Sequence, residues 1–328
     1  MSGAFTWHGG RLSDARAHFG DGPHPWIDLS TGVNPAPWPG ALSAGTDWQN
    51  LPDPAALRAL EQAAAACFGV DADYVCAVPG SELGLRLLGT LIDGPAYHRV
   101  PSYRTHSAIF AGSEPLEITA PLPVGSSVLV MANPNNPDGR VLGAEAVRQS
   151  LARQTEAGGW LVVDEAFADV TPRYSVAPLV GDSRPLIVTR SFGKFFGLAG
   201  VRLGFVLGPR AILARLRALL GDWPISAAGV VMGTAAYRDV IWIAAAREAM
   251  AIRAAALDTL LRAHGLDPSG DCALFRLIDH PDAQALFTML GRQQILTRPF
   301  AENPRWLRFG LPYGEAELGR LDGALSRG

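Results

Sequence analysis

The stretch that decides the fold is residues 189–205, TRSFGKFFGLAGVRLGF, which joins two short apolar runs, PLIVT (185–189) and LGFVLG (203–208). Apolar runs of this length are typical of strands buried on both faces of a sheet. Lys194 therefore lies in the connection between two buried strands. Beside Gly193 and two phenylalanines its amine would be desolvated, which lowers the pKa of a lysine and prepares it to form a Schiff base. A lone lysine is more often a solvated surface residue, so further residues have to support this interpretation.

Similar apolar runs recur on the N-terminal side of this stretch. They are VCAV (75–78), SVLVMA (127–132) and WLVVD (160–164). Apolar residues with helical spacing precede the first run at 55–69 and separate the last two runs at 144–154. Strands that are buried on both faces and separated by helices indicate the α/β class, with a largely parallel sheet covered by helices.

The C-terminal third of the chain has a different pattern. The Ala-rich segment 227–264 predicts one long helix. Strand candidates follow at 273–278, 294–298 and 306–311, and a final helix is expected from Glu315. Short strands mixed with helices in this way indicate a smaller α+β lobe.

A chain of 328 residues exceeds what one compact core usually holds, so we expect more than one lobe. The first 54 residues are rich in Gly, Pro, Trp and His without a sustained period, which predicts loops or an arm. The expected parts are an N-terminal arm (1–40), a large three-layer αβα domain (41–235) and a small α+β domain (236–328).

Composition and charge exclude several classes of protein. The 28 basic and 31 acidic residues give a net charge of −3, so no overall field attracts nucleic acid. The N-terminus is polar where a signal peptide would be apolar, and the apolar stretch 229–246 is interrupted by Arg238 and Asp239, so we expect neither export nor a membrane span. Three scattered cysteines are too few for a disulfide framework or a zinc site, which favours a reducing compartment, the cytoplasm.

Residues near Lys194 are suited to bind a phosphate. Ser191 lies three positions before it and Arg202 eight positions after it, which places a hydroxyl and a guanidinium near the amine. The segment Gly80-Ser81-Glu82 follows a strand and opens a helix, where free N–H groups and the helix dipole attract an anion. Such turns also occur without any function.

Polar residues follow two of the expected strands. The string NPNNPDG (133–139) comes after one strand, and Asp164 ends another. Asn and Pro at a strand end can simply form a turn, and Asp164 could cap a helix. Ligands of open α/β sheets, however, bind at the carboxyl ends of the strands, where an amide, a carboxylate, a lysine and an arginine all fall here. Their joint occurrence predicts a site.

The order Asn136, Asp164, Lys194, Arg202, within NPNNPDG, VVDEAF and SFGKFFGLAGVRLGF, resembles the fold type I pyridoxal-phosphate enzymes of the class I/II aminotransferase superfamily. The resemblance covers nearly the whole chain. It implies the fold of the pyridoxal-phosphate-dependent transferases and pyridoxal 5'-phosphate as the cofactor. It also implies a homodimer, because the N-terminal arm reaches a neighbouring active site in this family.

The resemblance implies a role for each matching residue. Lys194 would form the Schiff base, and Asp164 would keep the ring nitrogen protonated so that the ring accepts electrons. Asn136 would donate to the ring 3-oxygen, and Tyr103 in PSY would stack on the ring. Ser81, Ser191 and Arg202 would hold the cofactor's phosphate. Gly80 and Glu82, beside Ser81, are the other residues expected to bind the cofactor.

The sequence departs from the family pattern at three positions. Phe167 stands where a tyrosine commonly contacts the ring 3-oxygen, so we expect one hydrogen bond fewer and a raised pKa of the Schiff base. Leu51 replaces the tyrosine that reaches the phosphate of a neighbouring subunit, and Gly193 replaces a frequent serine.

Two N-terminal motifs, WHGG (7–10) and DLSTGVNP (28–35), are similar to the branch of the family that decarboxylates L-threonine O-3-phosphate in cobalamin biosynthesis. This small phosphorylated amino acid carries a carboxylate and a phosphate, and both need cations or donors. Arg308, in WLRFGL, matches the arginine that binds the substrate carboxylate in the superfamily. The other candidates for substrate binding are His8, Gly32, Asn34 and Arg298.

Two other functions share these motifs. An aminotransferase of the histidinol-phosphate type would use the same cofactor residues, with Lys194 as the base of a 1,3-proton shift. A catalytically inactive protein that only binds the cofactor is the third possibility, and the intact Lys194 argues against it.

Overall fold

The computed structural model describes residues 4–327, which form two compact units. Within the described residues, the large unit comprises 37–136 and 140–244, and the small unit comprises 4–36, 137–139 and 245–327. These limits differ from the expected ones, because residues 4–36 belong to the small unit instead of forming a separate arm. The C-terminal boundary of the large unit falls between residues 244 and 245, whereas the expected boundary lies between 235 and 236.

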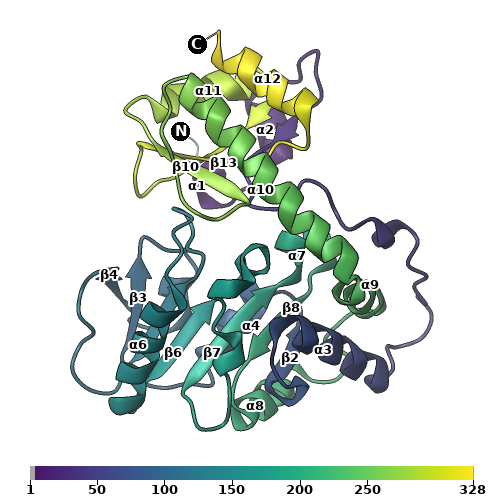
Figure 1. Cartoon of the computed structure of the whole chain (residues 1–328), viewed down its shortest axis with the longest axis vertical. Helices are drawn as coiled ribbons and strands as arrows, with labels where there is room; N and C mark the ends of the chain where they lie inside the picture. The colour runs from purple at the N-terminus through teal and green to yellow at the C-terminus, as the bar shows by residue number, and fades with distance from the viewer. Residues whose placement is uncertain (1–3, 328) are drawn as a thin grey trace. The chain divides into compact units, whose positions relative to one another are not determined.

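A seven-stranded sheet forms the centre of the large unit (Figure 1). The strands in their order across the sheet are β2 (Val75–Val78), β8 (Gly204–Leu207), β7 (Leu186–Ser191), β6 (Trp160–Asp164), β5 (Val128–Ala132), β3 (Ala96–Val100) and β4 (Glu114–Glu117). Every neighbouring pair is parallel except those of β8, which runs antiparallel to β2 and β7. The prediction of a largely parallel, buried sheet is therefore confirmed.

Helices pack on both faces of this sheet because successive strand side chains point to opposite faces. On one face Val206 belongs to an apolar cluster with Leu88 of α4 (Ser81–Leu88) and Leu213 of α8 (Arg210–Leu220). On the other face Phe205 contacts Phe68 and Tyr237 through their rings. These two residues come from α3 (Pro54–Phe68) and α9 (Ala227–Arg238). The large unit is thus a three-layer αβα structure. Its other helices are α5 (His106–Ile109), α6 (Ala144–Glu156) and α7 (Phe192–Phe195).

The expected single helix over 227–264 is wrong. The structure has two helices, α9 and α10 (Val240–Ala263), which are separated at Asp239. The Asp239 carboxylate accepts hydrogen bonds from the Trp242 backbone N–H and from Nε1 of Trp38, each at 3.0 Å. An aspartate that accepts from the third residue after it caps a helix, so this side chain starts α10.

The small unit contains a four-stranded antiparallel sheet. Its strands, in order, are β12 (Arg298–Pro299), β13 (Trp306–Gly310), β10 (Phe275–Asp279) and β9 (Pro268–Ser269). A separate parallel pair joins β1 (Ile27–Asp28) to β11 (Ile295–Leu296). The helices here, besides most of α10, are α1 (Ala4–Trp7), α2 (Leu12–Phe19), α11 (Ala283–Arg292) and α12 (Glu315–Leu325).

The N-terminal segment is more ordered than its composition predicts. Phe5 and Phe19 pack against Phe287 of α11, with ring centroids 5.4 and 5.7 Å from that ring. Aromatic contacts of this kind hold a segment in place without a regular apolar period, which is why the sequence showed no element here. Among the described residues, no helix has the length and apolar character needed to cross a membrane.

Candidate active site

The residues expected to bind the cofactor lie at one edge of the large sheet. Ala132, Asp164 and Thr189 are register partners on β5, β6 and β7, so these three parallel strands reach the same edge, where β7 extends two residues further. Asn136 follows the first of them, and Lys194 lies in α7, directly after the third. Because β8 is antiparallel to β7, Gly204, the first residue of β8, lies at the same edge. The loop before β8 supplies a cation to this edge. That cation is Arg202, two positions before the strand.

The Asp164 carboxylate is buried and has three hydrogen-bond partners. Oδ1 accepts from Oγ1 of Thr189 at 3.0 Å and from the Ala166 N–H at 3.1 Å. Oδ2 lies 3.1 Å from Nε2 of His106, which is fully buried. Three partners of this kind hold a carboxylate in one orientation. His106 is not among the residues that the sequence predicts for the site, although its position three residues after Tyr103 is a usable signal.

The turn between β2 and α4 lies against the side chain of Arg202. Gly80 has φ +87°, and a Cβ there would lie 2.8 Å from Nη2 of Arg202. A Cβ at Gly204 would come within 2.9 Å of the Gly80 carbonyl carbon. The positive φ favours glycine at position 80, and at position 204 a side chain would collide with the backbone of the first turn of α4, at Ser81. Ser191 is buried at the end of β7.

Tyr103 is oriented by Glu82. Its hydroxyl donates to Oε2 of Glu82 at 2.9 Å, and Oγ1 of Thr105 donates to the same carboxylate at 2.9 Å. Nε of Arg86 donates to Oε1 at 2.7 Å. Burial raises the pKa of the Tyr103 hydroxyl to about 12. The side chain of Glu82 thus orients Tyr103, the residue that is expected to stack on the cofactor ring.

Lys194 lies beside Phe167. Its Nζ is 5.8 Å from the centroid of the Phe167 ring, and this ring is buried. The glycine before the lysine has a steric cause, since a Cβ at Gly193 would lie 2.7 Å from Cα of Ala199. This departure from the family pattern therefore fits the local packing of the chain.

A buried charge cluster, which the sequence does not predict, adjoins these strand ends. Arg190, next to Ser191, donates from Nη1 to Oε2 of Glu165 at 2.9 Å and from Nη2 to Asp169. Burial alone would lower the pKa of Arg190, but Asp169 and Glu165 raise it. Burial raises the pKa of Glu165.

The small unit brings together most of the residues expected to bind the substrate. Arg298 and Arg308 are register partners on β12 and β13, and both are buried. Nη2 of Arg308 donates to the Ser30 carbonyl at 3.0 Å, and Nη2 of Arg298 lies 3.4 Å from the Trp7 carbonyl. The two N-terminal motifs therefore lie against the two arginines. His8 is exposed.

Gly32 and Asn34 lie in the loop that follows β1, and both are buried. Oδ1 of Asn34 accepts from the Ala36 N–H at 3.0 Å, so this side chain stabilises its own loop.

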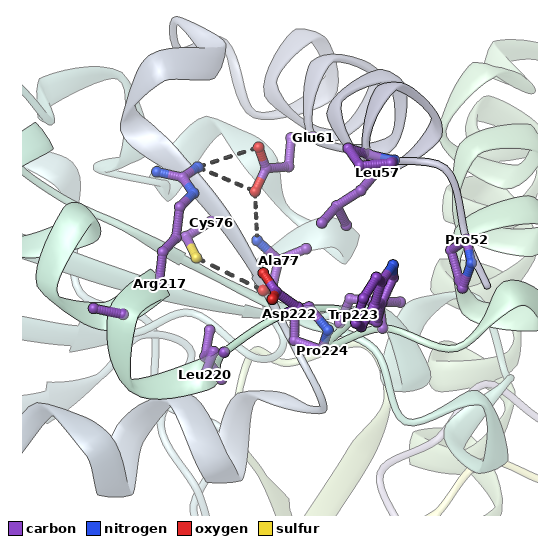
Figure 2. A pocket seen from close by; sticks show the side chains of 14 residues that line it. Pro52, Leu57, Glu61, Cys76, Ala77, Arg217, Leu220, Asp222, Trp223 and Pro224 are labelled. Atoms are coloured by element: carbon purple, nitrogen blue, oxygen red, sulfur yellow. Dashed lines mark hydrogen bonds and ion pairs between the residues drawn. The ribbon is translucent and has the colours of Figure 1, made fainter.

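A separate pocket in the large unit has a volume of about 480 Å³. Figure 2 shows Glu61 and Arg217 joined by an ion pair on its wall, with Cys76 and Trp223 among the other lining residues. None of the expected site residues is among the described residues that line it.

The αβα fold and the lysine, aspartate, asparagine and arginine at one sheet edge define an enzyme of the fold type I pyridoxal-phosphate-dependent class. The chain belongs to the aminotransferase class I and II family, whose model matches residues 116–321.

The curated relatives carry the names of two different activities. Threonine-phosphate decarboxylases from Sinorhizobium sp. and Pseudomonas aeruginosa are 39% and 41% identical to this chain. The first alignment covers 98% of this chain and 97% of the relative, and the second covers 97% and 96%. Histidinol-phosphate aminotransferase 1 from Bordetella parapertussis is 31% identical, with 92% of each chain covered.

Solved structures show the same fold. The histidinol-phosphate aminotransferase from Sinorhizobium meliloti, in complex with pyridoxal-5'-phosphate, has a TM-score of 0.83 at 22% identity, covering 96% of this chain and 93% of that one. The L-threonine-O-3-phosphate decarboxylase from Porphyromonas gingivalis has a TM-score of 0.77 at 17% identity, covering 91% and 98%.

Proposed function

We propose that this protein uses pyridoxal 5'-phosphate to decarboxylate L-threonine O-3-phosphate, forming (R)-1-aminopropan-2-ol O-2-phosphate and CO2, a step of cobalamin biosynthesis. The observation that carries the proposal is the full-length similarity to two threonine-phosphate decarboxylases, at 39% and 41% identity. The packing of the WHGG and DLSTG motifs against Arg298 and Arg308 supports it, because those motifs resemble the decarboxylating branch more than the aminotransferases.

The residues at the sheet edge fit the cofactor. Gly80, whose Cβ would meet Arg202, leaves room for a phosphate at the N-terminus of α4. The buried carboxylate of Asp164 suits a protonated ring nitrogen. Lys194 would carry the aldehyde, Tyr103 would cover the ring, and Ser81, Ser191 and Asn136 would complete the contacts. When bound, the cofactor supplies an electron sink for the bond that breaks at the substrate Cα.

The chain's own residues direct the reaction. Asp164, oriented by His106 and Thr189, holds a proton on the ring nitrogen. Arg298 and Arg308 bind the anionic groups of the substrate and so decide which bond at Cα stands ready to break. The Cα–carboxylate bond breaks, CO2 leaves without the bonding electrons, and Nζ of Lys194 delivers the proton that Cα gains.

An aminotransferase acting on histidinol phosphate is the second candidate. The relative from Bordetella parapertussis, at 31% identity, favours it. Both reactions use the same residues of the large unit, so the difference between them must come from how the substrate is held.

The product distinguishes the two functions. We expect the purified protein, loaded with pyridoxal 5'-phosphate, to release CO2 and an amine in equal amounts from L-threonine O-3-phosphate without any 2-oxo acid. Lys194→Ala should release neither. Turnover only with histidinol phosphate and 2-oxoglutarate would establish the aminotransferase instead. No turnover in either assay, with cofactor bound, would point to a protein that only binds the cofactor.

The protein is also proposed to be a homodimer. Leu42, Trp48 and Leu51, in the segment before α3, are 98%, 78% and 65% exposed, and large apolar side chains exposed in one segment favour a protein partner. Sedimentation equilibrium should give twice the mass of 34.8 kDa, and a monomer at micromolar concentration would contradict this. A cytoplasmic location stays a prediction from the three cysteines.

A further inference from the structure

We propose that Ser30 is a positioning residue that holds the turn His8-Gly9-Gly10 against Arg308 and thereby builds the site for an anionic group of the substrate. The inference rests on the proposed function, because it takes the substrate to be a phosphorylated amino acid. All of the residues that carry it belong to the small unit.

Ser30 joins two segments through its side chain. Its Oγ accepts from the Gly10 N–H at 2.7 Å and donates to Oδ1 of Asp28 at 2.5 Å. The same Asp28 oxygen accepts from the Ser30 N–H at 2.9 Å. Ser30 is 2% exposed, and a buried hydroxyl with both donor and acceptor functions satisfied has one preferred orientation. The position of Gly10 is therefore tied to the end of β1.

The backbone of Ser30 makes the second connection. Its carbonyl accepts from Nη2 of Arg308 at 3.0 Å, and Arg308 is 2% exposed. Gly9 lies directly on this carbonyl, since a Cβ at position 9 would be 2.8 Å from the Ser30 carbonyl carbon. A side chain there would have to displace either the turn or the group that receives the guanidinium.

The other end of the turn is held by the neighbouring strand. Arg298, the register partner of Arg308, has its Nη2 3.4 Å from the carbonyl of Trp7. Trp7 is thus held by Arg298. Gly9 and Gly10 are held by Ser30, whose carbonyl in turn binds Arg308. The exposed His8 lies between the two anchored positions.

The positive charges of Arg298 and Arg308 indicate that such a site would bind an anion. Two buried guanidiniums on adjacent strands repel each other, and burial together with Arg298 holds the pKa of Arg308 well below its usual range. An anion between two cations relieves this repulsion and gains charge-assisted hydrogen bonds. The carboxylate or phosphate of the substrate has this chemistry, and inorganic phosphate is a simple probe of it.

The test compares Ser30→Ala and Gly9→Ala with wild type. A matched control is Gly319→Ala, because a Cβ at Gly319 meets no atom within 4 Å. For both test variants we expect KM for L-threonine O-3-phosphate to rise about tenfold while kcat changes by less than about twofold. The phosphate concentration that half-maximally raises the unfolding temperature should increase by a similar factor. Asp28→Asn keeps an oxygen acceptor for the Ser30 hydroxyl. Its increase in KM and in the half-maximal phosphate concentration should therefore be smaller than that of Ser30→Ala.

Absorbance of the bound cofactor is the check on a merely structural effect. It should stay as in wild type for both variants, because the cofactor residues belong to the large unit. Unchanged KM and unchanged phosphate protection in Ser30→Ala would overturn the inference, as would a loss confined to kcat. If Gly9→Ala does not fold, Ser30→Ala alone decides. If wild type lacks activity on threonine phosphate but Ser30→Ala still weakens phosphate protection, the proposed function fails and the positioning role stands.

Discussion

Nε2 of His106 lies 3.1 Å from Oδ2 of Asp164, and both side chains are buried at the edge of the large sheet. Asp164 also accepts hydrogen bonds from Thr189 and Ala166, so its carboxylate is held from two sides. The orientation of this acid, and not only its presence, is therefore a property of the fold.

The first prediction concerns this pair. His106→Phe keeps an aromatic ring at this buried position but removes the hydrogen bond to Asp164. We expect the affinity for pyridoxal 5'-phosphate to fall about tenfold, because a hydrogen bond to a charged group contributes about 1.5–3 kcal/mol. Equilibrium titration followed by absorbance measures this. The exposed pair His264–Asp322 supplies the control, since His264→Phe should leave cofactor affinity unchanged.

The second prediction concerns Phe167, whose ring lies 5.8 Å from Nζ of Lys194. Phe167→Tyr adds a hydroxyl that can donate to the 3-oxygen of the bound cofactor and so stabilise its deprotonated form. The pKa of the absorbance transition should therefore be lower than in wild type. Phe167→Leu, which adds no donor, should not lower it. An unchanged pKa in Phe167→Tyr would show that the two groups do not meet.

The third prediction concerns Gly193, where many family members have serine. Because a Cβ there would lie 2.7 Å from Cα of Ala199, Gly193→Ser should displace the 3₁₀ turn Ala199–Val201 and, with it, Arg202. We expect weaker cofactor binding instead of the gain that a family-like residue would suggest. Gly181→Ser is the control, since a Cβ at Gly181 meets nothing within 4 Å. Equal affinities for the two variants would contradict this account.

The fourth prediction concerns the buried cluster around Arg190. Arg190→Met leaves Glu165 and Asp169 without their cation, and breaking a buried pair in this way costs about 3–5 kcal/mol in the free energy of unfolding. Urea denaturation measures the loss. Arg148→Met, which removes an exposed pair with Glu145, should cost far less.

The loss in Arg190→Met should also depend on pH. The pKa of Glu165 is already raised by burial, and without Arg190 it rises further. When the folded state raises the pKa of a carboxyl group, the stability that the protonated group contributes is fully present below the pKa of the unfolded chain, near 4.5. It is lost as the pH rises above that value. The deficit relative to wild type should therefore be larger at pH 8 than at pH 5. A deficit independent of pH would mean that Glu165 is not the group involved.

The fifth prediction concerns the thiols. Burial raises the pKa of Cys76 and of Cys272 from 9.0 to about 12, whereas Cys67 is only half-buried. At pH 8 a disulfide reagent should react with Cys67 alone in the folded protein, and with all three thiols after denaturation. The raised values also predict that stability falls as pH rises from 9 toward 12. Rapid reaction of Cys272 in native conditions would be inconsistent with this burial.

Several parts of the fold could be predicted because their signals are local. The run WLVVD indicated the buried strand β6, and Gly69 marked the end of α3. The break at Asp239 could not be predicted, because the Ala-rich sequence around it favours a helix throughout. There the Asp239 carboxylate caps α10 through the Trp242 N–H and also accepts from Nε1 of Trp38, which is 201 positions away in the sequence.

The sequence by itself determined the α/β class, the family and the residue types at the strand ends, because apolar period and motif spacing are written in consecutive residues. Only the tertiary structure decided that His106 meets Asp164 and that Ser30 meets Arg308. The members of these pairs are 58 and 278 positions apart. Their meeting depends on strand order and chain path, which the packing of the whole unit determines.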